Sequence, residues 1–121
     1  MMATNDIFEI TGIKKDDGQI IASLTINSRS EIFKGHFPGQ PVVPGACMLQ
    51  VVKDVLESAL ADTFRLKKAG HLKFVNMIVP GNEVLLLNIV YKMDEEDLSV
   101  TAKLSSADVV CFKFQGLFVK I

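Results

Sequence analysis

Apolar and polar residues alternate along two stretches near the amino terminus, a period of two that is typical of strands with one buried face. These stretches are residues 6–14 and 18–27, and the alternation is clearest in the second, where Ile20, Ala22 and Leu24 form one face. An Asp-Gly pair at positions 17 and 18 separates them and favours a tight hairpin turn. The chain is therefore predicted to begin with a β-hairpin.

A helical pattern follows a loop. Residues 28–43 are rich in glycine and proline, which predicts irregular structure, and Pro44 suits the first position of a helix. From Gly45 to about Ala61, polar residues recur at helical spacing among apolar ones, and they are Gln50, Lys53, Asp54, Glu57 and Ser58. The pattern predicts a mostly buried helix with one narrow polar stripe.

Three or four more strands are predicted after the helix, in the runs at residues 69–79, 83–93, 98–106 and 109–120. Turn-forming residues at positions 80–82 and 94–97 separate the first three. Two strands, one long helix and a run of strands make an α+β pattern, and the economical packing is a curved antiparallel sheet wrapped around the helix. No repeat or linker interrupts the sequence, so residues 1–121 are expected to form a single domain.

Composition narrows the function classes. The chain of 121 residues is 49% hydrophobic and 22% charged, and its formal charge of -1 argues against nucleic acid as a partner. The apolar runs are too short for a membrane span, and no signal peptide is evident. Cys47 and Cys111 lie in apolar surroundings, so we expect free thiols in a reducing, cytoplasmic compartment. No motif suggests a metal, nucleotide or flavin, so no cofactor is predicted.

The segment "GHFPGQPVVPGACMLQ" contains the best candidate chemistry. Unpaired N–H groups at a helix start can polarise a carbonyl oxygen, and Gly45 has no side chain to keep a ligand away. His36, in a proline-stiffened loop, is the nearby side chain that titrates near neutral pH. A base beside a polarised carbonyl suits removal of a proton next to a thioester. The pattern is also consistent with a structural or exposed histidine and a solvated polar stripe.

This segment closely resembles the active-site segment of the (3R)-hydroxyacyl-[acyl-carrier-protein] dehydratases. Their motif has the form G-H-F-P-x-x-P-x-x-P-G, and all seven fixed positions match between Gly35 and Gly45. The stretch "KFVNMIVPGNEV", residues 73–84, is similar to a strand and turn of the same family. The resemblance covers roughly residues 6–120 and implies the hotdog fold.

The resemblance also implies a site. His36 is then the catalytic base, and the helix start at Gly45 and Ala46 holds the thioester carbonyl through the N–H of Gly45. Phe37 and Phe74 line the acyl channel, unless they are plain core residues. The expected substrate is an acyl carrier protein or coenzyme A thioester, and the expected assembly is a homodimer or a larger assembly of dimers.

One position departs from the family. Gln50 stands where the family has Glu or Asp, and an amide cannot protonate a departing hydroxide, although it can donate a hydrogen bond. Many members carry Gln four residues later, where this chain has Asp54. Positions four apart share a helix face, so the amide and the acid look interchanged. The hypothesis is that Asp54 supplies the acid directly or through water; a solvated or dimer-interface Asp54 is the alternative.

Three other functions stay open. A hotdog thioesterase would use His36 or Asp54 to activate water. Cys47, in the first helical turn, is a nucleophile or, more ordinarily, a core residue. A non-enzymatic homologue would bind acyl carrier protein without turnover. A basic run could then contact this acidic partner, although a solvated turn is the ordinary interpretation of such a run. The run consists of Arg65, Lys67, Lys68 and Lys73. The remaining histidine, His71, is predicted at a strand end without a role.

Overall fold

A computed structural model describes residues 7–27, 45–78 and 84–121 of the chain. The described part contains one helix and six strands. In chain order they are β1 (Phe8–Asp16), β2 (Gln19–Ile26), α2 (Gly45–Leu60), β3 (Phe64–Phe74), β4 (Leu85–Asp94), β5 (Asp97–Ser106) and β6 (Val109–Lys120).

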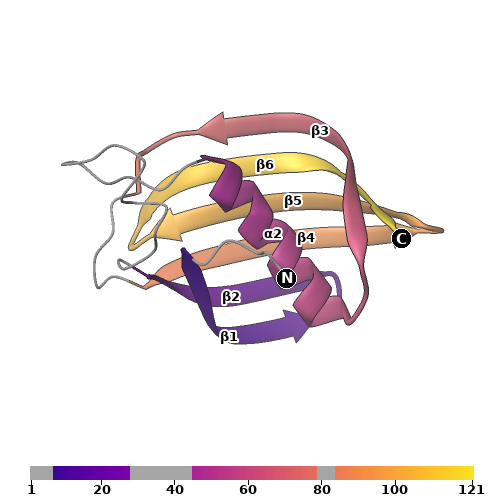
Figure 1. Ribbon diagram of the computed structural model, residues 1–121, viewed down its shortest axis with the longest axis horizontal. Coiled ribbons are helices and arrows are strands. Elements are labelled where there is room, and N and C mark those ends of the chain that lie inside the picture. Colours follow the sequence, from indigo (N-terminus) through magenta and orange to yellow (C-terminus); the bar gives the residue numbers. More distant parts are fainter. Residues whose placement is uncertain (1–6, 28–44, 79–83) are drawn as a thin grey trace.

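The strands form one antiparallel sheet in the order β1-β2-β4-β5-β6-β3. The sheet curves around α2, which crosses its concave face (Figure 1). The β1–β2 turn contains Gly18 at φ +79°, a conformation that glycine adopts without the strain of a side chain. The strand β3 directly follows the helix in the chain but lies at the far edge of the sheet, beside β6. The α+β prediction is therefore confirmed.

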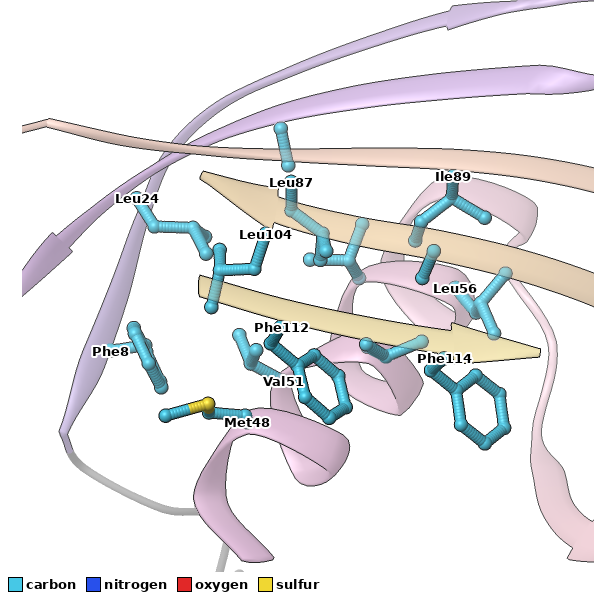
Figure 2. Packing of buried hydrophobic residues seen from close by; sticks show 14 of the residues in the cluster. Phe8, Leu24, Met48, Val51, Leu56, Leu87, Ile89, Leu104, Phe112 and Phe114 are labelled. Carbon is cyan, nitrogen blue, oxygen red and sulfur yellow. The ribbon is translucent and has the colours of Figure 1, made fainter. Parts of the chain in front are cut away.

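The core lies between α2 and the concave face. The helix buries six side chains, which are Cys47, Met48, Val51, Val52, Val55 and Leu56. Alternate residues of β2, β4 and β5 are buried against them, as the period of two predicts. Figure 2 shows Met48, Val51 and Leu56 of the helix facing Leu104, Phe112 and Phe114 of β5 and β6. Within the described segments, no helix is long and apolar enough to span a membrane.

The largest error in the predicted elements concerns β3. The sequence pattern placed this strand at 69–79, whereas it runs from Phe64 to Phe74. Ten of its 11 positions are exposed, on both faces near the sheet edge, and they include Arg65, Lys67 and Lys68. Because neither face of most of the strand is buried, the alternation that marks a strand is missing there. The other predicted bounds lie within two residues of the observed ones.

Glu57 ties the helix to the first residue of β3. Its Oε2 accepts a hydrogen bond from the backbone N–H of Phe64 at 2.8 Å, and the Phe64 side chain is fully buried. Lys53, one turn earlier, forms an ion pair with the same carboxylate at 3.3 Å. The carboxylate therefore fixes the point at which the chain leaves the helix and enters the sheet edge.

We expect Glu57→Ala to lower the free energy of unfolding by about 1–3 kcal/mol, because the N–H of Phe64 loses its acceptor. Glu57→Gln keeps an oxygen at this position and should retain most of the stability. The control is Lys53→Ala, which removes only a partly exposed ion pair and should cost less than about 1 kcal/mol. Urea unfolding measures all three variants. Equal losses for Glu57→Ala and Lys53→Ala would show that the bond to Phe64 is not important.

Candidate active site

The start of α2 is packed against an aromatic ring from β3. A Cβ added to Gly45 would lie 2.5 Å from Cζ of Phe74, so only glycine allows the ring to rest at this position. Phe74 also stacks on Phe112 of β6, with ring centroids 5.3 Å apart. Phe74 is nevertheless 50% exposed. The structure thus brings Gly45 and Phe74 together at an open, partly apolar position.

The first turn of the helix leaves its amino end free of negative side chains. It contains no acidic residue, so no carboxylate within this turn neutralises the partial positive charge of the helix start. Ala46 is exposed beside Gly45. A small exposed surface at the start of a helix, where backbone N–H groups point outward, is suited to a ligand oxygen that carries or develops negative charge.

One turn further along the helix, Gln50 and Asp54 form a pair. Nε2 of Gln50 donates a hydrogen bond to Oδ1 of Asp54 at 2.9 Å, and both side chains are half-buried. Besides this bond, an amide can donate a second hydrogen bond and accept others through its carbonyl oxygen. The sequence spacing predicted that the two residues share a face, and their hydrogen bond confirms this.

The environment of Asp54 favours its protonated form. Burial raises the pKa of the Asp54 carboxyl above its ordinary value, while the Gln50 hydrogen bond and the charge of Lys53 oppose this shift and the charge of Glu57 supports it. The net direction is upward. A carboxyl that holds its proton to higher pH is better suited to act as a general acid.

The polar stripe of the helix is not an ordinary solvated face. Gln50, Lys53, Asp54 and Glu57 are half-buried and hydrogen-bonded to one another or to β3, and Ser58 alone in the stripe is exposed. The stripe therefore carries two side-chain pairs, Gln50 with Asp54 and Lys53 with Glu57, beside an apolar core.

The other predicted site residues have different outcomes. His36 and Phe37 lie outside the described residues, so their roles stay predictions. Cys47 is 8% exposed and belongs to the core cluster, which supports the packing interpretation over the nucleophile. Neither Cys47 nor Cys111 belongs to a disulfide. Among the residues that the structure describes, no three His, Cys, Asp or Glu side chains lie close enough to hold a metal ion.

The basic run is a strand rather than a turn. Arg65, Lys67, Lys68 and Lys73 all lie on β3, and Nζ of Lys67 pairs with the Asp97 carboxylate at 3.1 Å. His71 lies within β3, three residues from its end, instead of at a strand end. Sequence reasoning missed the shared surface that these residues form, because it depends on pairing between strands that are distant in the chain.

Comparison with known proteins agrees with the family suggested by the motif. The ApeI-like family, described as ApeI dehydratase, matches residues 12–115. A 3-hydroxyacyl-[acyl-carrier-protein] dehydratase FabZ of Psychrobacter arcticus is 31% identical over 120 residues, which cover 81% of this chain and 75% of that protein. The FabZ of Oenococcus oeni is 29% identical over 97 residues, or 74% of this chain and 69% of the relative. Two further FabZ relatives, from Xanthomonas euvesicatoria and Clostridium acetobutylicum, match over only about half of their length.

A solved structure shows the same fold. The dehydratase heterocomplex ApeI:P from Xenorhabdus doucetiae superposes with a TM-score of 0.76 at 20% sequence identity, covering 90% of this chain and 96% of that one. The predicted hotdog fold is therefore confirmed. Since the family match extends over most of the sequence, the chain belongs to the FabZ/ApeI-like dehydratase family.

Proposed function

We propose that this protein removes water from 3-hydroxyacyl thioesters to give 2-enoyl thioesters, with Asp54 as the acid in place of the usual residue at position 50. The observation that carries the proposal is the hydrogen bond between Gln50 and Asp54 on a half-buried face, together with the raised pKa of Asp54. Family membership supports the reaction class. The geometry supports Asp54 as the proton donor and Gln50 as its hydrogen-bonding partner.

In the proposed reaction, the N–H of Gly45 binds the thioester carbonyl and stabilises negative charge that develops on its oxygen. The imidazole of His36 removes a proton from the carbon next to the carbonyl. The bond from the following carbon to its hydroxyl breaks as protonated Asp54 supplies a proton, so the hydroxyl leaves as water. Gln50 orients the Asp54 carboxyl through one N–H and can donate its second N–H to the hydroxyl. Exchange with solvent returns both groups to their starting states.

The proposed assembly uses the free edge of the sheet. The strand β3 has β6 on one side and no partner strand on the other within the described segments. Leu66, Leu72 and Phe74 are exposed along it, and a second copy would cover them. A homodimer or an assembly of dimers is therefore proposed, in a cytoplasmic protein of one domain. Since the Xenorhabdus relative forms a heterocomplex, a mass measurement on the purified particle should also look for an unlike subunit.

A product assay tests the proposed function. Incubation with 3-hydroxyacyl thioesters of several chain lengths, on acyl carrier protein and on coenzyme A, is followed by mass spectrometry. Loss of one water and appearance of a conjugated double bond are expected. Release of a free thiol would identify a thioesterase instead. Intact substrate at every chain length, despite binding, would identify a carrier-binding homologue without this activity.

Asp54→Asn is expected to lower dehydration turnover about 10²-fold, because the variant keeps the hydrogen-bonding shape but has no proton to give. The loss should appear mainly in kcat. Ser58→Ala, one turn further on the exposed end of the same stripe, is the control and should be unaffected. Unchanged turnover in Asp54→Asn would show that another group supplies the proton.

The raised pKa of Asp54 also predicts a pH dependence of stability. A folded state that binds the proton more tightly than the unfolded state loses stability as pH rises, from the ordinary Asp value of 3.8 through the raised folded pKa. Asp54→Asn lacks this loss. The free energy of unfolding of wild type minus that of the variant should therefore fall as pH rises from 3.8 through the raised pKa. Above that pKa the difference should be constant. A difference that is independent of pH would contradict the shift.

A further inference from the structure

The strand β6 contains a bulge beside the point where β3 ends. The β5–β6 pairing shifts register after Leu104, and the shift leaves Cys111 as an extra residue on β6. Cys111 and Phe112 are both buried, whereas successive residues of a regular strand face opposite sides of the sheet. The bulge therefore changes the direction in which the backbone groups of β6 point at this position.

Three hydrogen bonds join the bulge to the residues that follow β3. The carbonyl oxygen of Cys111 accepts from the backbone N–H groups of Val75 at 2.8 Å and Asn76 at 3.3 Å. The side-chain Nδ2 of Asn76 donates to the carbonyl oxygen of Val110 at 2.8 Å. Ile78, two residues further along, is 3% exposed and belongs to the core cluster. The Asn76 side chain thus supplies one of three bonds that fix the chain between β3 and Ile78.

These bonds begin directly after Phe74, the last residue of β3. The Phe74 ring occupies the space beside the helix start, since a Cβ on Gly45 would lie 2.5 Å from Cζ and 2.8 Å from Cε1. The stacking on Phe112, next to the bulge residue, holds the ring from the β6 side. The position of the ring against the helix therefore depends on how the end of β3 is attached to β6.

Burial contributes little to the stability of this end of β3. Every position from Arg65 to Phe74 is exposed. A segment with few buried apolar side chains opens locally at a free energy far below that of the whole domain. A single side-chain hydrogen bond is then a large share of the local stability. Loss of the Asn76 bond should therefore release the ring while the core stays folded.

An aromatic ring held at this position affects how the helix start binds a carbonyl group. The ring excludes water from one side of Gly45, and a hydrogen bond is electrostatically stronger where the dielectric constant is low. Donors that are in place before the reaction stabilise the charge that develops in the transition state without further reorganisation. A released ring would admit water beside the Gly45 N–H and weaken this stabilisation.

We propose that Asn76 is a positioning residue of the thioester site. Its bond to the carbonyl of Val110 holds the Phe74 ring against Gly45, where the ring shields the N–H that binds the carbonyl oxygen. The effect on catalysis rests on the proposed function, whereas the effect on the ring follows from the contacts alone.

NMR of the full chain with ¹⁵N-labelled glycine tests the position of the ring. The chain has eight glycines, and the Gly45 resonance is identified by its loss in Gly45→Ala. An aromatic ring shifts the resonance of a nearby amide, so Phe74→Leu gives the Gly45 resonance without the ring. In Asn76→Ala the resonance should move at least halfway toward the Phe74→Leu position. Asn76→Asp, which has the same shape but no N–H to donate, should give a similar shift.

The matched control is Thr11→Val, at the other edge of the sheet. Oγ1 of Thr11 donates to the carbonyl oxygen of Ser23 at 3.1 Å, where the β1–β2 pairing also shifts register. The substitution therefore removes the same kind of bond from an exposed edge strand far from Gly45. It should leave the Gly45 resonance at its wild-type position. In both variants the urea midpoint should fall by less than about 1 M.

Turnover of a short 3-hydroxyacyl thioester tests the effect on catalysis. Asn76→Ala should lower kcat about 3- to 10-fold and change KM by less than about 2-fold, because the ring acts on charge that develops after binding. Thr11→Val should keep the wild-type kcat. A change confined to KM would show that the ring acts on substrate binding and would overturn the proposed role.

The outcomes separate this proposal from the proposed function. If no thioester is dehydrated but the Gly45 resonance moves in the Asn76 variants alone, the reaction is wrong and the positioning of the ring by Asn76 stands. If dehydration occurs and Asn76→Ala keeps the wild-type resonance and kcat, the positioning role is wrong. Equal shifts in Thr11→Val, or loss of the folded state in Asn76→Ala, would show a general effect on the sheet and would also overturn it.

Discussion

Gln50→Glu is expected to raise dehydration turnover about 10- to 100-fold, within the range that a positioned general acid contributes. The substitution places a carboxyl at the family position, one helical turn closer to Gly45 than Asp54 lies. The new side chain fits the space that Gln50 occupies, because Glu and Gln have nearly the same shape. Single-turnover and steady-state kinetics on a short 3-hydroxyacyl thioester measure the change without the contribution of carrier docking.

The same substitution changes the proton balance on the helix. The Gln50 amide now donates to Oδ1 of Asp54, and a carboxylate in its place would repel that oxygen unless one of the two holds a proton. Two neighbouring carboxyls share a proton, and the higher of their apparent pKa values is raised. The Gln50→Glu variant should therefore be active to higher pH than wild type. Its stability should fall as pH rises through that upper value, because the folded state then binds the proton more tightly than the unfolded state.

Gln50→Met is the matched control, since it has similar volume but neither donates to Asp54 nor carries a proton. Its turnover should fall below that of wild type, because the Asp54 carboxyl loses its orienting partner. If Gln50→Glu folds normally but is no faster than wild type, Asp54 already provides full acid assistance. An increase in Gln50→Met would show that the amide hinders the reaction.

His36→Ala is expected to lower turnover about 10²–10⁴-fold, the contribution of a lost general base. The loss should appear in kcat, because the alanine variant keeps the helix start that binds the carbonyl. The remaining rate should also lose the pH dependence that a titrating imidazole gives near neutrality. Assays with a short thioester again exclude effects on carrier binding.

The chain provides its own control for that experiment, since it contains two histidines. His71 lies on the convex face of β3, on the other side of the sheet from the helix. His71→Ala should therefore leave turnover of a short thioester unchanged. Equal activity losses for the two variants would argue for a general effect on the fold. An active His36→Ala enzyme would remove the imidazole from the mechanism.

Features that depend on local spacing could be predicted from the sequence. The periodicity placed α2 to within one residue at its end, and the spacing of four placed Gln50 and Asp54 on one face. The glycine at position 45 was singled out because it opens the helix start. Its contact with Phe74 joins residues almost thirty positions apart and was not predicted, because the resemblance gave the two residues separate roles.

Features that depend on strand register could not be predicted in the same way. Lys73, Lys103 and Lys113 become neighbours because β3 pairs with β6 across the sheet, an arrangement that no local pattern specifies. The raised pKa of Asp54 likewise reflects burial beneath other elements. The start of β3 was missed because an exposed edge strand lacks the alternation that a buried face imposes.

The charges at the two borders of the sheet bear on how this protein avoids uncontrolled self-association. A long unpaired strand is a template to which further strands can add without limit, and lysine is a common means of preventing this. The β3 strand carries Arg65, Lys67, Lys68 and Lys73, and β1 at the other border carries Lys14 and Lys15. A symmetric pair of molecules joined at β3 would close that border of each sheet. The lysines of β1, at the other border, would then discourage the addition of further strands. The chain should therefore form particles of finite size and resist fibril growth even when concentrated.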